Sequence, residues 1–329
     1  MKITIITPSA GGTRTGNWHT AQRYARFLRG AGHVVRTALR WDGAACDLMI
    51  ALHARKSHDS IARFRARFPR GPLIVVLTGT DLYRDLPADA SARASLALAT
   101  LLVTLQDQGE RELPSRLRHK VRVVYQSART GARARQSLRR FRICVLGHLR
   151  EEKDPFRAGL ALAHLRGEGA VEVVQIGEAL APAMAATARR LMDREPRYLW
   201  IGGVAHRRAL GWLASSQLLV VSSRMEGGAN VVCEAVRVGV PVAASRIPGN
   251  VGMLGTDYAG YFPLGDERSL ARLIDRARVD RAFYRRLRTG IAGRRHLFAP
   301  AAERRALLAV VREAARLARP QPRGKRPSV

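Results

Sequence analysis

The chain alternates twice between short apolar strands and amphipathic helices. Runs rich in β-branched residues, such as residues 2–8, 48–52 and 73–78, are separated by stretches with helical periodicity. This alternation is the pattern of parallel βαβ units, in which a helix connects each strand to the next. It continues to about residue 124 and starts again at residue 141. The sequence therefore predicts two successive doubly wound α/β sheets, which are Rossmann-like domains.

The domain boundary is expected in residues 127–136, which are small and polar and lack apolar periodicity. A chain of 329 residues is also long enough for two compact cores. We predict an N-terminal domain over residues 1–135, a C-terminal domain over residues 136–318 and a disordered tail over residues 319–329. Strands are expected at residues 2–8, 34–39, 48–52, 73–78, 101–105, 121–124, 141–146, 171–176, 198–201, 218–221 and 241–244.

The charge of the chain is strongly positive, with a formal net charge of +31. Only five of the 57 basic residues are lysines, and the arginines are scattered over most predicted helices. Scatter of this kind indicates a compositional bias towards arginine and a steering field for anionic substrates. A nucleic acid would favour a concentrated basic stripe, so we expect no nucleic-acid partner.

The remaining composition favours a cytoplasmic, metal-independent protein. The first apolar run is too short for a signal peptide, and no stretch approaches the roughly 20 apolar residues of a membrane-spanning helix. Cys46, Cys144 and Cys233 lack the spacing of a zinc or redox site and are expected to be buried thiols. The sequence contains no Asp-x-Asp pair of the kind that holds a metal ion. We therefore expect no metal, no cofactor and no stable membrane association.

Residues 222–235 form the most informative candidate loop of the second half. They follow an apolar strand, contain Gly227 and Gly228 at a turn and lead into a helix. Glycines let backbone amides approach a ligand, and a helix N-terminus offers unpaired N–H groups to phosphate. Because one carboxylate can accept hydrogen bonds from two vicinal hydroxyls, we expect one of Glu226 and Glu234 to bind a sugar and the other a ribose. By itself, the spacing of the two glutamates also fits ordinary surface charges.

Residues 147–155, after the first strand of the second half, form a second candidate loop. Without a metal, cations and dipoles must neutralise a departing diphosphate, and Arg150 and Lys153 could do so. The alternative is surface ion pairing of these residues with Glu151 and Glu152. Further donor-binding residues are expected at Gly177, His148, Val204, Ser223 and Asn230.

Three loops of the first half, after its first, third and fourth strands, gather cations, hydroxyls and glycines. The carboxyl ends of parallel strands lie at one edge of a sheet, so these loops should lie together. Their composition suits a small phosphate-like acceptor, although each basic residue alone also fits a surface charge. His53, at the end of a strand, is our candidate catalytic histidine. The residues assigned to the acceptor are Gly11, Gly12, Arg14, Asn17, His19, Arg55, Lys56, Thr78, Thr80 and Asp81, the last of which could instead order its own loop.

The second half resembles the C-terminal domain of family 4 glycosyltransferases. The resemblance rests on residues 147–153, the spacing between the two glutamates and residues 234–242. It implies the GT-B fold, a nucleotide-sugar donor and no metal. In this resemblance Lys153 matches the family's diphosphate lysine, Glu226 the carboxylate near the donor sugar and Glu234 the ribose carboxylate. The family usually has an arginine where this chain has His148, so we assign the missing charge to Arg150.

Over its full length the chain resembles more narrowly the selenosugar synthases of the selenoneine pathway. This resemblance rests on residues 7–9, 17–20, 52–57, 77–83 and 147–155. It implies transfer of N-acetylglucosamine from UDP to selenophosphate, with formation of a carbon–selenium bond. Selenophosphate is already ionised, so His53 would need only to orient it or balance its charge.

Two other functions are compatible with parts of this pattern. One is a family 4 glycosyltransferase that acts on a lipid or polysaccharide at a membrane surface, which an amphipathic basic helix would favour. No such helix is clear in the first half. The other is a non-enzymatic, basic nucleic-acid-binding protein, which would bind DNA with a steep salt dependence and have no affinity for UDP.

Overall fold

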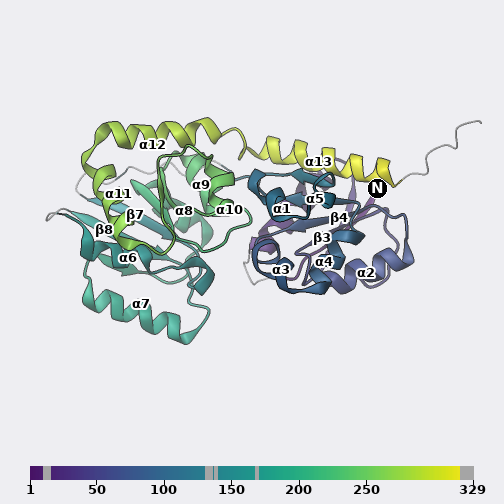
Figure 1. Ribbon diagram of the computed structural model, residues 1–329, viewed down its shortest axis with the longest axis horizontal. Helices are drawn as coiled ribbons and strands as arrows, with labels where there is room; N and C mark the ends of the chain where they lie inside the picture. Colours follow the sequence, from purple (N-terminus) through teal and green to yellow (C-terminus); the bar gives the residue numbers. More distant parts are fainter. Residues whose placement is uncertain (10–15, 130–135, 137–139, 167–169, 319–329) are drawn as a thin grey trace, which may run out of the picture. The chain divides into compact units, whose positions relative to one another are not determined.

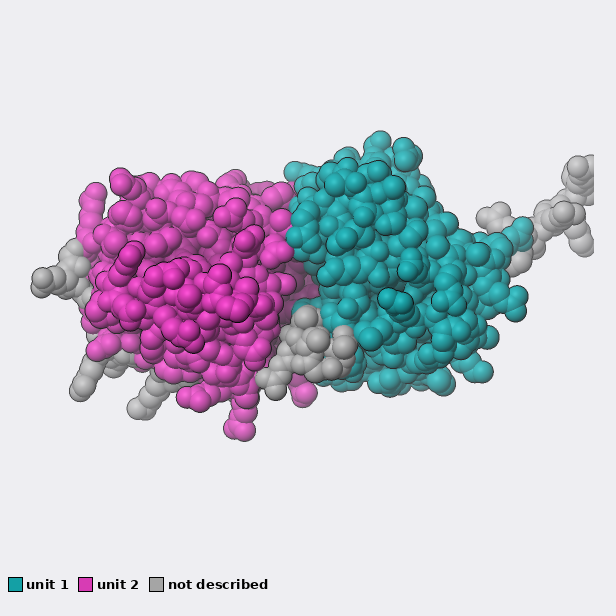
Figure 2. Space-filling view, turned by 90° about the horizontal axis from the view of Figure 1, so that it is seen from below, with its two compact units in different colours: residues 1–105, 110–124, 304–329 teal, residues 106–109, 125–303 magenta. Residues whose placement is uncertain are grey.

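The computed structural model describes residues 1–9, 16–129, 136, 140–166 and 170–318. This part of the chain forms two compact units, which Figure 2 shows in different colours. The first unit comprises residues 1–105, 110–124 and 304–329, and the second comprises residues 106–109 and 125–303. Each unit is built on a parallel sheet with helices packed on it (Figure 1). The predicted fold class, two Rossmann-like α/β domains, is confirmed.

The sheet of the first unit has the strand order β2-β1-β3-β4-β5-β6. Its strands are β1 (Lys2–Ile6), β2 (Val34–Ala38), β3 (Leu48–Leu52), β4 (Leu73–Leu77), β5 (Leu101–Thr104) and β6 (Val121–Val123). Its helical segments are α1 (Gly16–Arg29), α2 (His58–Arg67), η1 (Asp81–Asp85), α3 (Leu86–Ala88), α4 (Ala90–Leu98) and α5 (Ser115–Arg118). The strand order reverses between β1 and β3, which is the kind of position where open α/β sheets bind ligands.

The sheet of the second unit has the strand order β12-β11-β10-β7-β8-β9. Its strands are β7 (Phe141–Leu146), β8 (Val171–Ile176), β9 (Tyr198–Trp200), β10 (Leu218–Val221), β11 (Val242–Ser245) and β12 (Tyr261–Phe262). Its helical segments are η3 (Glu151–Lys153), α6 (Arg157–Ala161), η4 (Leu162–His164), α7 (Pro182–Arg194), α8 (His206–Ala214), α9 (Asn230–Val238), α10 (Pro248–Leu254), α11 (Glu267–Val279) and α12 (Arg281–Arg294). The order reverses between β7 and β10, so the loops after these two strands flank the switch point of this sheet.

The strands form where the sequence predicts them because a parallel sheet is covered on both sides. Every residue of β3 and of β4 is buried, as continuous apolar runs of this kind require. The sequence prediction missed β12, a two-residue strand at the edge of the second sheet. Two residues are too few to show a periodic pattern.

Most of the last helix, α13 (Pro300–Leu317), belongs to the first unit, whereas the sequence prediction placed it in the C-terminal domain. Its residues Leu307, Val310, Val311 and Ala314 are buried in the core of the first unit, in the same cluster as residues of α1, and α13 runs beside α1 in Figure 1. The chain from residue 304 therefore belongs to the first unit, and the earlier boundary lies near residue 124 instead of residue 135. An amphipathic pattern shows which face of a helix is apolar, but not which core that face joins.

Candidate active site

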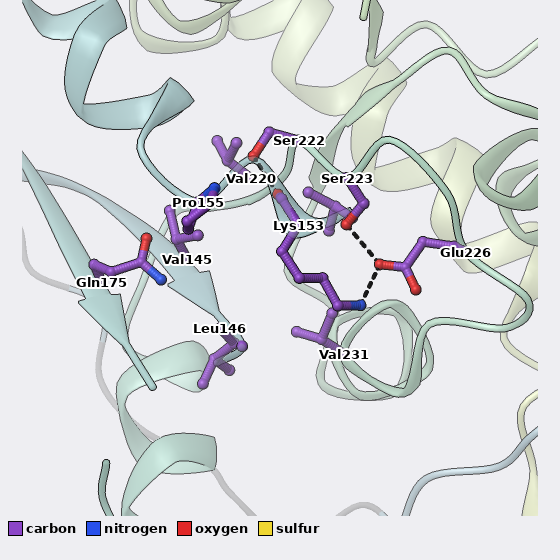
Figure 3. A pocket seen from close by; sticks show the side chains of 12 residues that line it. Val145, Leu146, Lys153, Pro155, Gln175, Val220, Ser222, Ser223, Glu226 and Val231 are labelled. Carbon is purple, nitrogen blue, oxygen red and sulfur yellow. Dashed lines mark hydrogen bonds and ion pairs between the residues drawn. The ribbon is translucent and has the colours of Figure 1, made fainter. Parts of the chain in front are cut away.

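Lys153 and Glu226 form an ion pair at the switch point of the second sheet. Lys153 ends η3, after β7, and Glu226 lies in the loop after β10. The Lys153 Nζ atom is 2.5 Å from Glu226 Oε1. The Ser223 hydroxyl donates a hydrogen bond of 2.6 Å to the same oxygen, and Figure 3 shows both side chains reaching Glu226. The Glu226 side chain is 8% exposed and that of Lys153 25%, so the carboxylate is held in place while the ammonium group is partly open to solvent.

The loop that carries Glu226 is fixed by residues of β11 and α10. The Ser245 hydroxyl donates to the Ser223 carbonyl at 2.6 Å, and the Asn250 amide donates to the Ser245 carbonyl at 2.9 Å. Gly249 packs so closely that a Cβ atom there would lie 1.9 Å from the Glu226 carbonyl oxygen. The sequence analysis missed Ser245, Gly249 and Asn250. The signal was the stretch from residue 245 to 250, which follows a strand and contains Pro248 before a helix.

A small pocket lies between the ends of β7, β8 and β10, and it includes the Lys153 and Glu226 side chains. Gln175, on β8, is buried in its lining. Neither oxygen nor nitrogen of its amide has a hydrogen-bond partner among the described residues. The sequence signal for Gln175 was a lone polar residue near the end of an apolar strand, and the sequence analysis missed it.

Two predicted donor residues shape the backbone beside this pocket. Gly177 has a φ of 153°, and a Cβ atom there would lie 1.9 Å from the Gly147 carbonyl oxygen. The loops after β7 and β8 can therefore pack together only because this position is glycine. His148, in the same contact, is partly buried, and its Nδ1 atom has no partner among the described residues.

The other residues predicted to bind the donor have fewer contacts with the Lys153–Glu226 pair. Arg150 is exposed, and its side chain has no recorded contact with Glu226 in the described part of the chain. Its role as a substitute for the family arginine stays a prediction. Gly227 and Gly228 form the bend before α9, and Asn230 is the first residue of that helix. Val204 packs partly buried against the core of this unit.

Glu234 lies on α9 and is paired with a residue that the sequence analysis missed. Its Oε1 atom is 2.8 Å from Nε2 of His206, the first residue of α8. The hydrogen bond to Glu234 raises the pKa of His206 above its ordinary value. No local pattern marks His206, because the pair joins two helices 28 positions apart in the sequence.

We expect the His206 titration to depend on Glu234. Below about pH 6.5 the imidazolium and the carboxylate attract each other, and this stabilisation is lost as the pH rises through the raised pKa of His206. Replacing Glu234 by glutamine removes the negative charge, so the pKa of His206 should fall. An NMR titration of the His206 imidazole measures this pKa. Glu195→Gln, which removes a carboxylate paired with Arg197, is the control and should leave the His206 titration unchanged. An unchanged His206 pKa in Glu234→Gln would contradict the pairing.

In the first unit, the loops after β3 and β4 are brought together. His53 Nε2 is 3.0 Å from Thr80 Oγ1. The buried carboxylate of Asp81 accepts hydrogen bonds from the backbone N–H groups of Ala54, Thr78 and Gly79 at 2.8–2.9 Å. Of the two roles considered for Asp81, the geometry favours ordering the loop, since three donors already occupy this carboxylate.

Arg55 forms an ion pair, whereas no ion pair of Lys56 is found among the described residues. Arg55 donates to the buried Asp85 carboxylate at 2.9 Å, and Arg84 also contacts Asp85. Lys56 is exposed, and no partner of its ammonium group is recorded in the described residues. Asp85 was missed by the sequence analysis. Its signal was a second aspartate four residues after Asp81, one turn along a helix.

The remaining acceptor predictions fall after β1. Asn17 and His19 lie in the first turns of α1, with Asn17 partly buried and His19 exposed. Gly11, Gly12 and Arg14 lie outside the described residues.

The described ranges of the chain contain neither a metal-binding cluster nor a membrane-spanning helix. No group of three or more His, Cys, Asp and Glu side chains is placed to hold a metal ion in these ranges. None of the helices described is long and apolar enough to cross a membrane. Cys144 and Cys233 are buried thiols, and burial raises the pKa of Cys144 to about 12.

The fold is shared with a class of solved structures that includes named glycosyltransferases. HepE of Anabaena, in complex with UDP and glucose, matches with a TM-score of 0.74 at 15% identity, over 95% of this chain and 100% of that chain. Sucrose-phosphate synthase of Thermosynechococcus elongatus matches with a TM-score of 0.76 at 17% identity, over 95% and 98%. The lipopolysaccharide outer core galactosyltransferase WaaB matches with a TM-score of 0.70 at 13% identity, over 95% and 99%. The chain therefore has the GT-B fold.

A match to a known family lies in the second unit. Residues 140–279 match the family model of glycosyl transferases group 1, and this range includes Lys153, Glu226 and Glu234. This part of the chain is similar to glycosyl transferases group 1, in agreement with the resemblance drawn from the sequence. No curated protein sequence matches the chain.

Proposed function

We propose that the protein is a glycosyltransferase that takes its sugar from a UDP-sugar bound to the second unit. The observation that carries this proposal is the Lys153–Glu226 pair at the switch point of β7 and β10. A lysine ammonium group has three N–H donors, and Glu226 occupies one of them. Two donors are therefore left for the oxygens of a diphosphate, which is the group that a nucleotide-sugar releases.

The neighbouring residues fit the other parts of such a donor. The start of α9 offers backbone N–H groups to phosphate, as helix N-termini do. His206 contacts one of the two Glu234 carboxylate oxygens, which leaves lone pairs for the vicinal hydroxyls of a ribose. HepE, whose structure was solved with UDP and glucose, has the same fold. Glu226 and Ser223 are then assigned to the hydroxyls of the donor sugar.

The reaction we propose is displacement at the anomeric carbon of the sugar. The bond from this carbon to the diphosphate oxygen breaks through an oxocarbenium-like transition state, and its electron pair leaves with UDP. Negative charge grows on the diphosphate during this step. Lys153 and the α9 N-terminus stabilise it, and such stabilisation acts on the transition state more than on the ground state.

We further propose that the acceptor is selenophosphate and that the transferred sugar is N-acetylglucosamine. A selenium lone pair would form the carbon–selenium bond as the bond to UDP breaks. Support comes from the resemblance of several loops to selenosugar synthases and from the chemistry of the first unit. There, a hydroxyl on Thr80 and an uncommitted ammonium group on Lys56 lie in loops at the same sheet edge. Hydroxyls and cations suit a small, dense anion.

A lipid or polysaccharide acceptor is the second candidate. It is supported by the fold shared with WaaB, which is named as a lipopolysaccharide galactosyltransferase. The two candidates make different products from the same donor, so one experiment separates them.

The test is an acceptor screen of the purified full-length protein. UDP-N-acetylglucosamine and UDP-glucose are each incubated with selenophosphate, thiophosphate, phosphate or a lipid and glycan extract, and mass spectrometry detects the product. We expect a sugar–selenium product from UDP-N-acetylglucosamine. A glycosylated lipid or glycan without a selenosugar would overturn the acceptor and leave the donor proposal intact. If no UDP is released with any acceptor and UDP does not bind, the enzyme proposal itself is wrong.

The same screen, repeated with a chelator, tests metal independence. We propose that Lys153 and the helix N-terminus supply the positive charge that a metal provides in other transferases. Turnover should then be equal with magnesium and with excess chelator. Loss of turnover in the chelator, restored by added magnesium, would contradict this.

A further inference from the structure

His53 is held by its backbone in an unusual conformation. Its φ is 71°, in the left-handed region that non-glycine residues seldom adopt. Its N–H donates to the Val76 carbonyl at 2.8 Å, and its carbonyl accepts from the Ser57 N–H at 3.1 Å. The residue is buried at the end of β3. Strain that the surroundings enforce in this way points to a functional position.

The contacts of the His53 ring define its tautomer. The Lys56 backbone N–H, which can only donate, lies 3.3 Å from Nδ1, so Nδ1 must present its lone pair. Burial lowers the pKa of His53, with Lys56 and Arg55 acting in the same direction and Asp81 and Asp85 against it. The neutral ring then carries its one hydrogen on Nε2. Asp85 Oδ2, 3.8 Å from Nε2, also favours a hydrogen at that position.

The hydrogen on Nε2 defines the role of the Thr80 hydroxyl. Thr80 Oγ1, 3.0 Å from Nε2, must accept this hydrogen bond. Its own hydrogen is then directed elsewhere, and no acceptor for it is recorded in the described residues. Thr80 is partly buried, so the residue is not closed off from solvent.

We propose that His53 is a positioning residue whose Nε2–H makes the Thr80 hydroxyl a hydrogen-bond donor to an oxygen of the anionic acceptor. The identity of that acceptor rests on the proposed function. Both ring nitrogens of His53 are occupied, so His53 has no free lone pair with which to act as a general base. Arg55 is paired with Asp85. The Thr80 hydroxyl is therefore left to orient the acceptor, and the Lys56 ammonium group to balance its charge.

The tautomer is tested without any turnover. In a long-range ¹H–¹⁵N spectrum of the labelled protein, the His53 ring should show a protonated Nε2 and an unprotonated Nδ1; His53→Asn identifies its signals. A hydrogen on Nδ1 would overturn the proposal. Inorganic thiophosphate should shift the Thr80 and His53 signals in the wild type, and Thr80→Val should abolish the His53 shift. A His53 shift that persists in Thr80→Val would also overturn it.

Kinetics test the coupling of the two side chains. Thr80→Val removes the hydroxyl and should raise the acceptor KM at least about tenfold, with UDP affinity unchanged, whereas Thr80→Ser should retain a near-normal KM. His53→Asn, which tolerates a left-handed backbone, should raise the acceptor KM similarly. His53→Gln keeps a donor near the Nε2 position and should recover part of the effect. In the Thr80→Val background, His53→Asn should add less than about twofold, because both act through one hydroxyl. Independent, multiplicative effects would overturn the proposal.

The NMR spectra and the kinetics together separate the failure of this inference from the failure of the proposed function. If the wild-type protein makes no selenosugar, the acceptor proposal fails, while the spectra with thiophosphate still decide the role of His53. If His53→Asn does not fold, as judged by its circular dichroism spectrum, the Thr80→Val and Thr80→Ser pair decides it. Equal KM values for those two variants would then overturn it.

Discussion

Replacing Lys153 by methionine is expected to lower kcat/KM for the UDP-sugar by about 100- to 1000-fold. The Lys153 ammonium group lies beside Glu226 at the switch point, with its Nζ atom 2.5 Å from Glu226 Oε1. Methionine keeps most of the side-chain volume and removes the charge. A group that stabilises the leaving diphosphate acts mainly in the transition state, so most of the loss should be in kcat. Steady-state measurement of UDP release gives kcat and KM of the variant and tests this prediction.

Four further variants help to interpret this result. Lys2→Met, which removes an exposed lysine from β1 in the other unit, is the matched control and should behave as the wild type. Glu226→Gln should also be strongly impaired, and the Lys153→Met/Glu226→Gln double variant should be little worse than either single one, because the pair acts as a unit. Arg150→Met measures separately whether Arg150 shares the charge. Activity of Lys153→Met within about threefold of the wild type would remove Lys153 from the proposed mechanism.

Replacing Gly249 by alanine is expected to destabilise the second unit by about 2 to 3 kcal/mol, the upper range for forcing an extra carbon into a packed site. The added Cβ would lie 1.9 Å from the Glu226 carbonyl oxygen, which is backbone and cannot rotate away. Either the Glu226 loop or α10 must move. Denaturant unfolding should show the lost stability, and calorimetry should show weaker UDP binding, because the loop carries the proposed sugar-binding carboxylate.

Gly211→Ala is the matched control for this prediction. Gly211 also lies inside a helix, α8, but a Cβ atom there would have no neighbour within 4 Å. Alanine has the higher helix propensity, so this variant should be more stable than the wild type by about 0.5 to 1 kcal/mol. Opposite signs for the two variants are the expected result. A neutral or stabilising Gly249→Ala would show that the loop yields without cost.

The sequence by itself determined the two sheets and the loops that carry the site. Apolar runs and turn residues are local properties, so the strands could be located without knowing their neighbours. Parallel strands place all their following loops at one edge of a sheet, and Lys153 and Glu226 could therefore be assigned to one site although 73 positions separate them. The same repeated alternation predicted two Rossmann-like domains, and the family resemblance implied the GT-B fold.

Only the tertiary structure decided which side chains meet. It brought His206 to Glu234, Asp85 to Arg55, Gly249 beneath the Glu226 loop and α13 into the first core. It also showed that the ring of His53 is fully engaged by its neighbours. Such contacts form over a few ångströms between elements that share no sequence pattern. They depend on strand order, side-chain rotamers and close packing, which are properties of the assembled core and not of any one segment.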